Sequence, residues 1–183
     1  MAATLTNLVA ALQVTLDATA TKTTDLTVPV DVLANPKLLS TTFGTGANKA
    51  DEIWHDRRVL ALSTAEELDL AGSLTNAFGD TINLATVKAI LIYNRTDETT
   101  TSPAHTATTA IIAIGGAAAN TWDGPFSDSS DIVNLATGGI FIVTRPDATG
   151  MAVTAGTGDK LKIDNLDGAN EALYDIVLIG ESS

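Results

Sequence analysis

Hydrophobic and polar residues alternate with a period of two near the start of the chain, at residues 12–17 and again at residues 26–32. Such alternation is typical of β-strands, and Pro29 within the second stretch indicates an edge position or a bulge. The apolar stretch at residues 8–12 is also compatible with a helix. We therefore expect residues 1–40 to form an extended N-terminal arm, or first strands that pack with the domain or with a neighbouring subunit, with one short helix as a further option.

The remainder, residues 41–183, contains short strand-like stretches separated by turns with Gly, Asp, Asn and Pro. "TINLATVKAILIYNR" at residues 81–95 has the strongest pattern, and its apolar run at residues 87–93 is typical of a central strand. "SLTNAFGD" at residues 73–80 predicts a turn. Further strands are expected in "RRVLALS", "EELDLAG", "TATTAIIAIGG", "DIVNLA", "GGIFIVTR", "KLKID" and "ALYDIVLIG". About nine to ten short strands without a βαβ rhythm predict a mainly β domain, an antiparallel, jelly-roll-like β-sandwich.

The amino-acid composition supports a mainly β fold and excludes some classes of binding partner. Hydrophobic residues make up 45% of the chain and aromatic residues 4%, so the core must be built mainly from aliphatic side chains. The net charge is −12 and the largest basic cluster is Arg57–Arg58, so we expect neither nucleic acid nor an anionic membrane as a partner. The absence of cysteine excludes disulfides. The N-terminus lacks the features of a signal peptide and no apolar run reaches about 18 residues, so we expect neither export nor a transmembrane helix.

"VTAGTGDKLKI" at residues 153–163 is the stretch most similar to a phosphate-binding loop. A P-loop needs Gly-Lys-Ser/Thr at its end and a helix after it. Here Gly158 precedes Asp159, no Ser or Thr follows Lys160, and the next residues alternate as a strand does. An aspartate in the loop would also repel phosphate. The stretch therefore predicts a glycine turn that leads into a strand, and we expect no nucleotide or other cofactor.

A metal site is not expected either. "DNLDGANE" at residues 164–171 places its acidic residues out of register with an EF-hand loop and favours a hairpin loop instead. His55 and His105 are far apart in the sequence, and neither has a second histidine at ligand spacing.

Catalytic combinations are weak in this sequence. A hydrolase would need His55 with an acid and a nucleophile such as Ser63, and a glycosidase would need paired carboxylates such as Glu66 and Asp69. There is no G-x-S-x-G motif, and few aromatic residues are available to line a carbohydrate cleft. We therefore predict no catalytic residues and do not expect an enzyme.

Five residues are candidates for an interface with another subunit or with a larger partner. "EIWHDRR" at residues 52–58 is the densest polar cluster, and "NTWDGPFSD" at residues 120–128 places aromatic residues in a polar loop. Tryptophan and arginine are enriched at interfaces, although a tryptophan that covers the core is equally common. The candidates are Trp54, Arg57, Arg58, Trp122 and Phe126.

Two parts of the chain resemble small virion proteins encoded in the structural modules of tailed bacteriophages. The first part is "TGANKADEIWHDRRVLALSTAEELDLAGSLTNAFGDTINLATVKAILIYNR"; the second is "GGIFIVTRPDATGMAVTAGTGDKLKIDNL", followed by "YDIVLIGES". The resemblance covers roughly residues 45–183 and includes no motif that defines an active site. It implies an all-β structural protein that decorates the exterior of the capsid and stabilises the junctions between capsomers.

The resemblance also implies partners and a location. We expect a homo-oligomer, with a trimer as the expected form, that binds the major capsid protein in a virion assembled in the cytoplasm of the host bacterium. An exterior position suits an acidic surface, because packaged DNA would repel it. The alternative is a tail or fibre component whose jelly-roll-like domain binds the host surface or a glycan.

Overall fold

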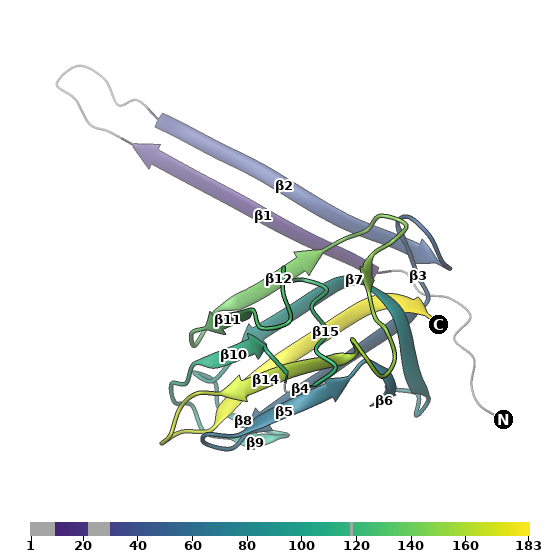
Figure 1. Cartoon of the computed structure of the whole chain (residues 1–183). Coiled ribbons are helices and arrows are strands. Elements are labelled where there is room, and N and C mark those ends of the chain that lie inside the picture. Colours follow the sequence, from purple (N-terminus) through teal and green to yellow (C-terminus); the bar gives the residue numbers. More distant parts are fainter. Residues whose placement is uncertain (1–9, 22–29, 118) are drawn as a thin grey trace.

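The computed structural model describes residues 10–21, 30–117 and 119–183, with side chains from residue 40 onward. Within these ranges the chain forms strands β1 to β15 and no helix, as Figure 1 shows. The predicted mainly β, sandwich-like fold is confirmed. The helix option at residues 8–12 is wrong for its described part, because residues 10–12 belong to β1, and residues 8–9 lie outside the described ranges.

Two sheets form the sandwich. The larger has the order β12-β7-β15-β4, with β13 and β6 also paired to β7, and the smaller has the order β11-β10-β14-β5. The strands of the larger sheet are β4 (Glu52–Leu60), β6 (Ala71–Thr75), β7 (Thr81–Asn94), β12 (Ile140–Thr144), β13 (Met151–Ala152) and β15 (Ala172–Ser182). Those of the smaller sheet are β5 (Ala65–Asp69), β10 (Ile112–Gly115), β11 (Ile132–Leu135) and β14 (Lys160–Asn165). A separate ribbon consists of β8 (Thr100–Thr101) and β9 (Ala104–His105).

The core lies between the two sheets and follows from the alternation in the sequence. In β14, each buried residue is flanked by partly exposed ones. Strand β7 lies between β12 and β15 and has four consecutive buried residues, 87–90, which agrees with its predicted central place. Isoleucine and leucine dominate both inner faces. Core residues include Ile112, Ile114, Leu161 and Ile163 from the smaller sheet, and Ile90, Ile92, Ile176 and Leu178 from the larger.

The eight main strands pair in a nested order. Counted along the chain as β4, β5, β7, β10, β11, β12, β14 and β15, the first pairs with the last, the second with the seventh, the third with the sixth and the fourth with the fifth. All four pairings are antiparallel. Two Greek keys joined in this nested way are the topology of a jelly roll. The jelly-roll part of the prediction stays an interpretation of this strand order.

Two strand boundaries differ from the prediction. Strand β4 begins at Glu52, so the polar cluster at residues 52–58 is itself part of a strand whose whole length pairs with β15. The segment at residues 73–80 is only partly a turn, because β6 continues to Thr75 and pairs with β7. Both boundaries are set by pairing with a neighbouring strand, which cannot be predicted from local residue preferences.

The N-terminal arm is a long hairpin of β1 (Ala10–Thr21) and β2 (Val30–Phe43) that projects away from the sandwich (Figure 1). The two strands pair without a break from Ala10 with Thr41 to Thr21 with Val30. At a rise of about 3.4 Å per residue, the paired part is about 40 Å long. The hairpin joins the body through Thr42 and Phe43, which pair in parallel with β3 (Lys49–Ala50). Pro29 lies outside the described residues.

Candidate functional site

The two tryptophans predicted at an interface lie in the core instead. Trp54 is 4% exposed and Trp122 is 1% exposed. Each indole N–H also has an internal acceptor, the Thr75 carbonyl at 3.2 Å for Trp54 and the Ala152 carbonyl at 2.8 Å for Trp122. Their burial leaves almost no surface for a partner, so a direct contact role does not fit the structure. Both are tryptophans that fill the core, the alternative that the sequence left open.

Phe126 is half-buried and also faces inward. Its ring stacks on that of Phe141, with centroids 6.1 Å apart and planes inclined by 19°. Both rings pack against the core cluster. The polar loop that carries Phe126 is held by the Asp131 carboxylate, which accepts hydrogen bonds from the amides of Ser127 and Asp128. The loop is therefore anchored to the sandwich, and an interface role of Phe126 stays a prediction.

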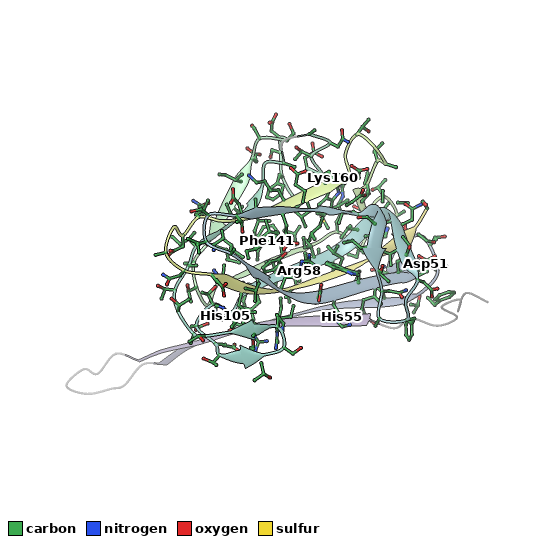
Figure 2. All side chains as sticks on the ribbon, turned by 90° about the horizontal axis from the view of Figure 1, so that it is seen from below. Asp51, His55, Arg58, His105, Phe141 and Lys160 are labelled. Atoms are coloured by element: carbon green, nitrogen blue, oxygen red, sulfur yellow. The ribbon has the colours of Figure 1, made fainter. Side chains whose placement is uncertain are left out.

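Arg58 lies at the edge where β4 and β5 close the sandwich (Figure 2). Its guanidinium binds the Glu66 carboxylate at 2.6 Å and the Asp56 carboxylate at 2.8 Å. Glu66 also accepts a hydrogen bond of 2.6 Å from the Tyr174 hydroxyl. This network joins the two sheets at their open edge, so Arg58 stabilises the sandwich itself, and its interface role stays a prediction.

Arg57 lies on the opposite face of β4, which points away from the core. It binds Asp175 of β15 in a two-pronged ion pair, with Nε at 2.6 Å and Nη2 at 3.0 Å. Arg95 binds the same carboxylate at 2.7 Å. Burial alone would raise the pKa of Asp175, but the hydrogen bonds from the two arginines outweigh it and lower that pKa. The positive charge of Arg57 is paired with Asp175 within the chain, and the interface role of Arg57 also stays a prediction.

The carboxylates considered for glycoside hydrolysis line one hollow of about 400 Å³, but they bind different partners. Glu66 is engaged by Arg58 and Tyr174, while Asp69 accepts a 2.7 Å hydrogen bond from Lys160 on the neighbouring strand. Glu66 and Asp69 therefore belong to separate ion pairs. In the described residues, no group of three or more His, Asp or Glu side chains is arranged to hold a metal ion.

The two histidines have separate surroundings. His55 lines a small hollow of about 240 Å³ together with Ser102 and Asp175. His105 is buried, and its Nε2 lies 3.1 Å from the Thr96 carbonyl oxygen, so this nitrogen carries the hydrogen. Ser63, the proposed nucleophile, donates its backbone amide to the Asp167 carbonyl in a turn after β4. Within the described part of the chain, no hydrogen bond or ion pair joins His55, His105 and Ser63 to one another.

The glycine stretch at residues 153–163 forms the predicted turn. Thr154 and Gly158 form a bridge, and Gly156 between them has a φ of +74°, which glycine adopts without strain. The Gly156 amide donates to the carboxylate of Asp159, a residue that is 4% exposed. Asp159 thus closes the turn from inside. Strand β14 follows directly, as the sequence predicts.

The prediction of a hairpin loop at residues 164–171 is wrong, because β14 and β15 on either side of this loop belong to different sheets and do not pair with each other. The Asp167 carboxylate accepts hydrogen bonds from the amides of Ala169 at 2.7 Å and Asn170 at 2.9 Å. These hydrogen bonds lower the pKa of Asp167. Its carboxylate stabilises the turn between β14 and β15.

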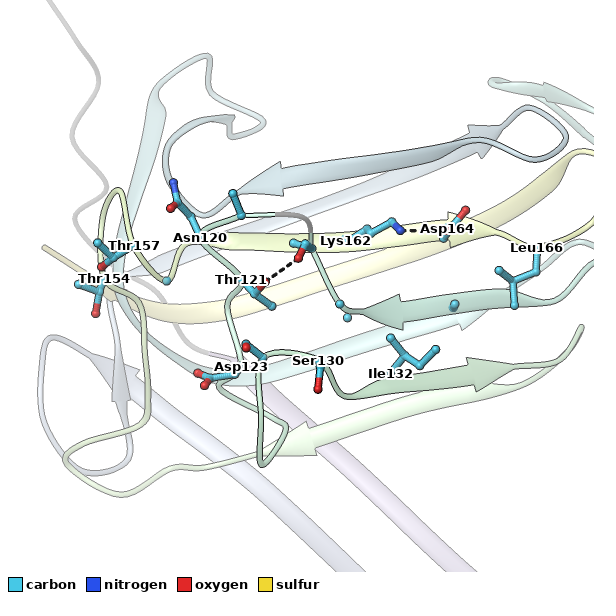
Figure 3. A pocket seen from close by; sticks show the side chains of 17 residues that line it. Asn120, Thr121, Asp123, Ser130, Ile132, Thr154, Thr157, Lys162, Asp164 and Leu166 are labelled. Atoms are coloured by element: carbon cyan, nitrogen blue, oxygen red, sulfur yellow. Dashed lines mark hydrogen bonds and ion pairs between the residues drawn. The ribbon is translucent and has the colours of Figure 1, made fainter.

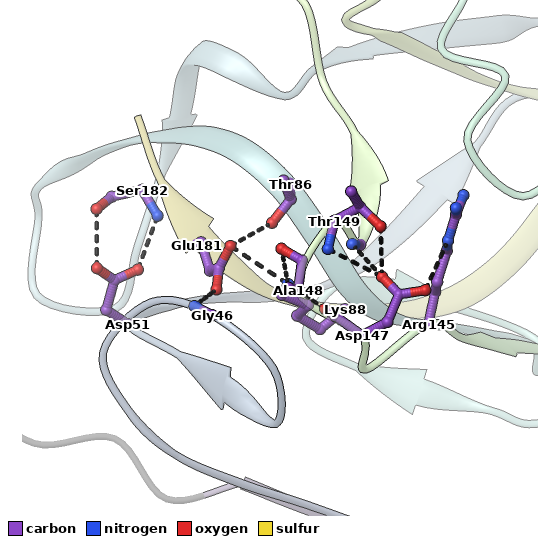
Figure 4. Close-up of polar contacts among 11 residues, drawn as sticks. Gly46, Asp51, Thr86, Lys88, Arg145, Asp147, Ala148, Thr149, Glu181 and Ser182 are labelled. Atoms are coloured by element: carbon purple, nitrogen blue, oxygen red, sulfur yellow. Dashed lines mark hydrogen bonds and ion pairs between the residues drawn. The ribbon is translucent and has the colours of Figure 1, made fainter.

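The base of the arm contains a buried ion pair that sequence reasoning missed (Figure 4). Lys88 is fully buried, and its Nζ lies 3.3 Å from the Glu181 carboxylate. The same ammonium donates to the carbonyl oxygens of Asp147 at 2.7 Å and Ala148 at 3.3 Å. Glu181 accepts from the Thr86 hydroxyl at 2.9 Å and from an amide of the loop that follows the arm. We call Lys88 and Glu181 the clasp.

A shift in strand pairing produces the clasp. Ile179 of β15 lies opposite Ala89, but the next residue, Gly180, lies opposite Val87, so Lys88 has no partner on β15. Such a bulge turns a side chain away from the regular alternation. A signal was present in the sequence, a lysine within the apolar run of β7, but its partner lies in the last strand.

The clasp holds the loop that connects the arm to the body. The amide of Gly46, between β2 and β3, donates to Glu181, and the Asn48 amide donates to the Pro146 carbonyl at 2.7 Å. Asp51, just after β3, accepts from the amide of Ser182 at 2.7 Å and from its hydroxyl at 2.9 Å (Figure 4). The base of the hairpin is therefore fixed to β7, β15 and the loop before β13.

A second surface feature is a groove of about 850 Å³ beside the smaller sheet (Figure 3). Its floor includes Ala113 and Gly115 of β10, whose small size leaves the hollow. The exposed side chains of Ile132 and Leu166 line one part. Polar residues line the rest, namely Asn120, Thr121, Asp123, Ser129, Ser130, Thr154, Thr157, Lys162 and Asp164. The groove offers hydroxyl, amide and carboxylate groups without an aromatic platform.

The part of the chain that the structure describes has no helix long and apolar enough to cross a membrane. Comparisons with known proteins add no relative: no family model, no curated protein sequence and no solved structure matches this chain.

Proposed function

We propose that this protein is a phage capsid decoration, or cement, protein that binds the exterior of the head and stabilises the junctions between capsomers. The observation that carries the proposal is the hairpin of β1 and β2, about 40 Å long, which projects from a β-sandwich and is fixed at its base. A rigidly rooted, outward-pointing hairpin suits a subunit that must grip a neighbouring surface. The resemblance of residues 45–183 to tailed-phage virion proteins supports the same function.

The distribution of charge also supports a binding role for the arm. Residues 1–43 contain three aspartates and two lysines, so they carry −1 of the total charge of −12, and residues 44–183 carry −11. An acidic body is repelled by other acidic surfaces, whereas a nearly neutral arm can approach them. In the proposed trimer, the major capsid protein would therefore be contacted through the arms and the adjoining ends of the sandwiches.

The test uses capsid shells that lack this protein. We expect purified protein to sediment with expanded shells at saturating, stoichiometric occupancy and not to associate with free capsid subunits. Shells with bound protein should also resist heat or chaotrope at a higher dose than bare shells. The proposal fails if the protein leaves expanded shells unoccupied, or if immunogold labelling places it on the tail.

The groove of about 850 Å³ favours a second candidate, a tail or fibre component that binds a host surface or glycan. Glycans are recognised by convergent hydroxyl, amide and carboxylate groups, which this groove supplies. A glycan array is the direct test. Binding should weaken in Asp123→Ala, which changes the groove, and persist in Asp128→Ala, whose carboxylate instead binds Ser130 within its own loop. An array without any bound glycan would reject this candidate.

A further inference from the structure

The two long sides of the sandwich have different edge strands (Figure 1). On one side, charged residues occupy the edge, namely Glu52, Asp56, Arg57 and Arg58 in β4 and Glu66, Glu67 and Asp69 in β5. On the opposite side, β11 and β12 contain no charged residue and no proline. Charged side chains on an edge strand keep other chains from pairing with it. The side of β11 and β12 lacks this protection.

Strand β12 leaves the backbone groups of every second residue without a partner strand. In an antiparallel pair, residues alternate between those that bond to the neighbouring strand and those whose backbone groups point away from it. Directly after β12, the Arg145 amide donates to the Lys88 carbonyl of β7 at 2.8 Å, which sets this alternation. Within the described part of the chain, β12 pairs with no strand other than β7. The residues whose backbone groups point outward are Ile140, Ile142 and Thr144.

The side chains of these three residues lie on the outer face of the larger sheet, and this face is apolar. Phe141 and Val143 pack against the core, so the residues that alternate with them face the other way. Ile140 is 56% exposed. The strand register continues the same face across β7, β15 and β4 with half-buried side chains, which are Leu91, Tyr93, Val177 and Ile53. An apolar surface therefore extends inward from the unprotected edge.

The edge of β12 adjoins the base of the arm. Pro146, two residues after β12, accepts a hydrogen bond of 2.7 Å from the Asn48 amide in the loop between β2 and β3. The edge therefore lies beside the surface through which contact with a capsid is proposed. Because residues 44–183 carry −11, a basic segment approaches this edge more readily than an acidic one. The same charge disfavours the body of a second copy as the occupant.

We propose that the edge of β12 binds an extended segment of another protein, which adds to the larger sheet as a further strand. The segment pairs with the outward backbone groups of β12, places alternate apolar side chains beside Ile140 and Ile142, and carries a net positive charge. In such strand addition, main-chain hydrogen bonds give affinity and the alternate side chains give specificity. The inference rests on the proposed function for the source of the strand, the capsid surface, and not for the edge itself.

The first experiment uses a synthetic peptide as the probe, so that its result does not depend on a capsid. The peptide alternates valine and threonine over about seven residues and has a lysine at each end. Two-dimensional amide NMR spectra of the isotope-labelled full chain follow the titration, with peptide added up to about 5 millimolar. We expect saturable shifts of the amide signals of Ile140, Ile142 and Thr144. Absence of these shifts in wild type, or shifts confined to β11, overturns the inference.

Two variants at one position separate the backbone from the side chain. Ile142→Pro removes an N–H that points away from β7, a position at which edge strands accept proline, and it should bind the peptide at least about tenfold more weakly. Ile142→Val is the matched control, because it keeps both the N–H and an apolar side chain, and it should bind within about threefold of wild type. Fluorescence of the buried Trp54 and Trp122 verifies the fold of each variant. Equal binding by a folded proline variant and wild type overturns the inference. Shifts of the same amides on raising the protein concentration without peptide also overturn it, because a second copy would then be the occupant.

The second experiment separates this inference from the proposed function. On binding to expanded shells, the segment at residues 139–145 should exchange its amide hydrogens at least about tenfold more slowly than in the free protein. Shell binding without this protection overturns the inference and leaves the decoration function standing. Peptide binding at β12 together with unoccupied shells has the opposite meaning, since the edge then accepts a strand and the decoration function fails.

Discussion

Lys88→Met tests the clasp at the base of the arm. Methionine has nearly the length of lysine and keeps the aliphatic stem buried, but it removes the ammonium that lies 3.3 Å from Glu181. Glu181, 7% exposed, keeps the Thr86 hydroxyl and the Gly46 amide as donors. The carbonyls of the loop before β13 lose their lysine donor as well. The substitution therefore leaves a buried carboxylate without its counter-charge.

The expected loss follows from this arrangement. Removing one partner of a buried ion pair typically costs about 3–5 kcal/mol, because the remaining charge stays in a poorly solvated place. Since Glu181 retains two hydrogen-bond donors, we expect the lower end, about 3 kcal/mol in the free energy of unfolding. For a domain of this size, that corresponds to a decrease in Tm of about 10 °C.

Denaturant unfolding, monitored by the fluorescence of the buried tryptophans, measures the loss, and a double-mutant cycle with Glu181→Gln identifies its cause. Glutamine keeps an acceptor for the loop amide but removes the charge. The double variant should therefore be less destabilised than the sum of the two single variants by about 1–3 kcal/mol. A loss below about 1 kcal/mol for Lys88→Met, or strict additivity, would refute the assignment of a coupled buried pair.

Three further substitutions probe the body. Burial raises the pKa of Glu52, so its ionisation favours unfolding as pH rises; Glu52→Gln should raise Tm at about pH 7 and leave it unchanged at about pH 3. Hydrogen bonds from the Thr149 hydroxyl and the Gly150 amide lower the pKa of Asp147 to about 2. Its contribution is present above about pH 4 and is lost as pH falls through about 2, so thermal-unfolding curves of wild type and Asp147→Asn should differ at neutral pH and converge at about pH 2. In Gly180→Ala, the new Cβ would lie 2.1 Å from the Thr86 carbonyl oxygen, so strand β15 must move, and urea unfolding should show a loss of about 1–3 kcal/mol.

The sequence predicts best those elements in which one sheet face is buried. In β14 the alternation of Lys160, Leu161, Lys162 and Ile163 fixes which residues enter the core, and the structure follows it. The turn before β14 is predictable for a similar local reason, because Gly156 occupies a conformation that other residues adopt with strain. In both places the determining interactions lie within a few residues along the chain.

Features that depend on distant strands were missed. Nothing near Lys88 indicates that it is buried beside Glu181, since that contact requires the pairing of β7 with β15 and the shift at Gly180. The burial of the two tryptophans was missed for the same reason. Trp54 and Trp122 lie in largely polar stretches of the sequence, and only the closure of the two sheets over them decides that they fill the core.

The clasp acts on the direction of the arm and not on the pairing of its two strands, which allows the two effects to be separated. Lys88 and Glu181 fix the loop at Gly46 and hence the direction in which the hairpin leaves the body. The pairing of β1 with β2 extends outward from there, from Ala10 with Thr41 to Thr21 with Val30. Below its Tm, Lys88→Met should therefore keep the oligomeric state of wild type, since the hairpin itself is unchanged. Its binding to expanded shells should be weaker, because several arms must be held in a fixed direction to engage one surface together. Sedimentation of the free protein and of the shells measures both, and an equal loss of the two would mean that the clasp and the hairpin form one unit.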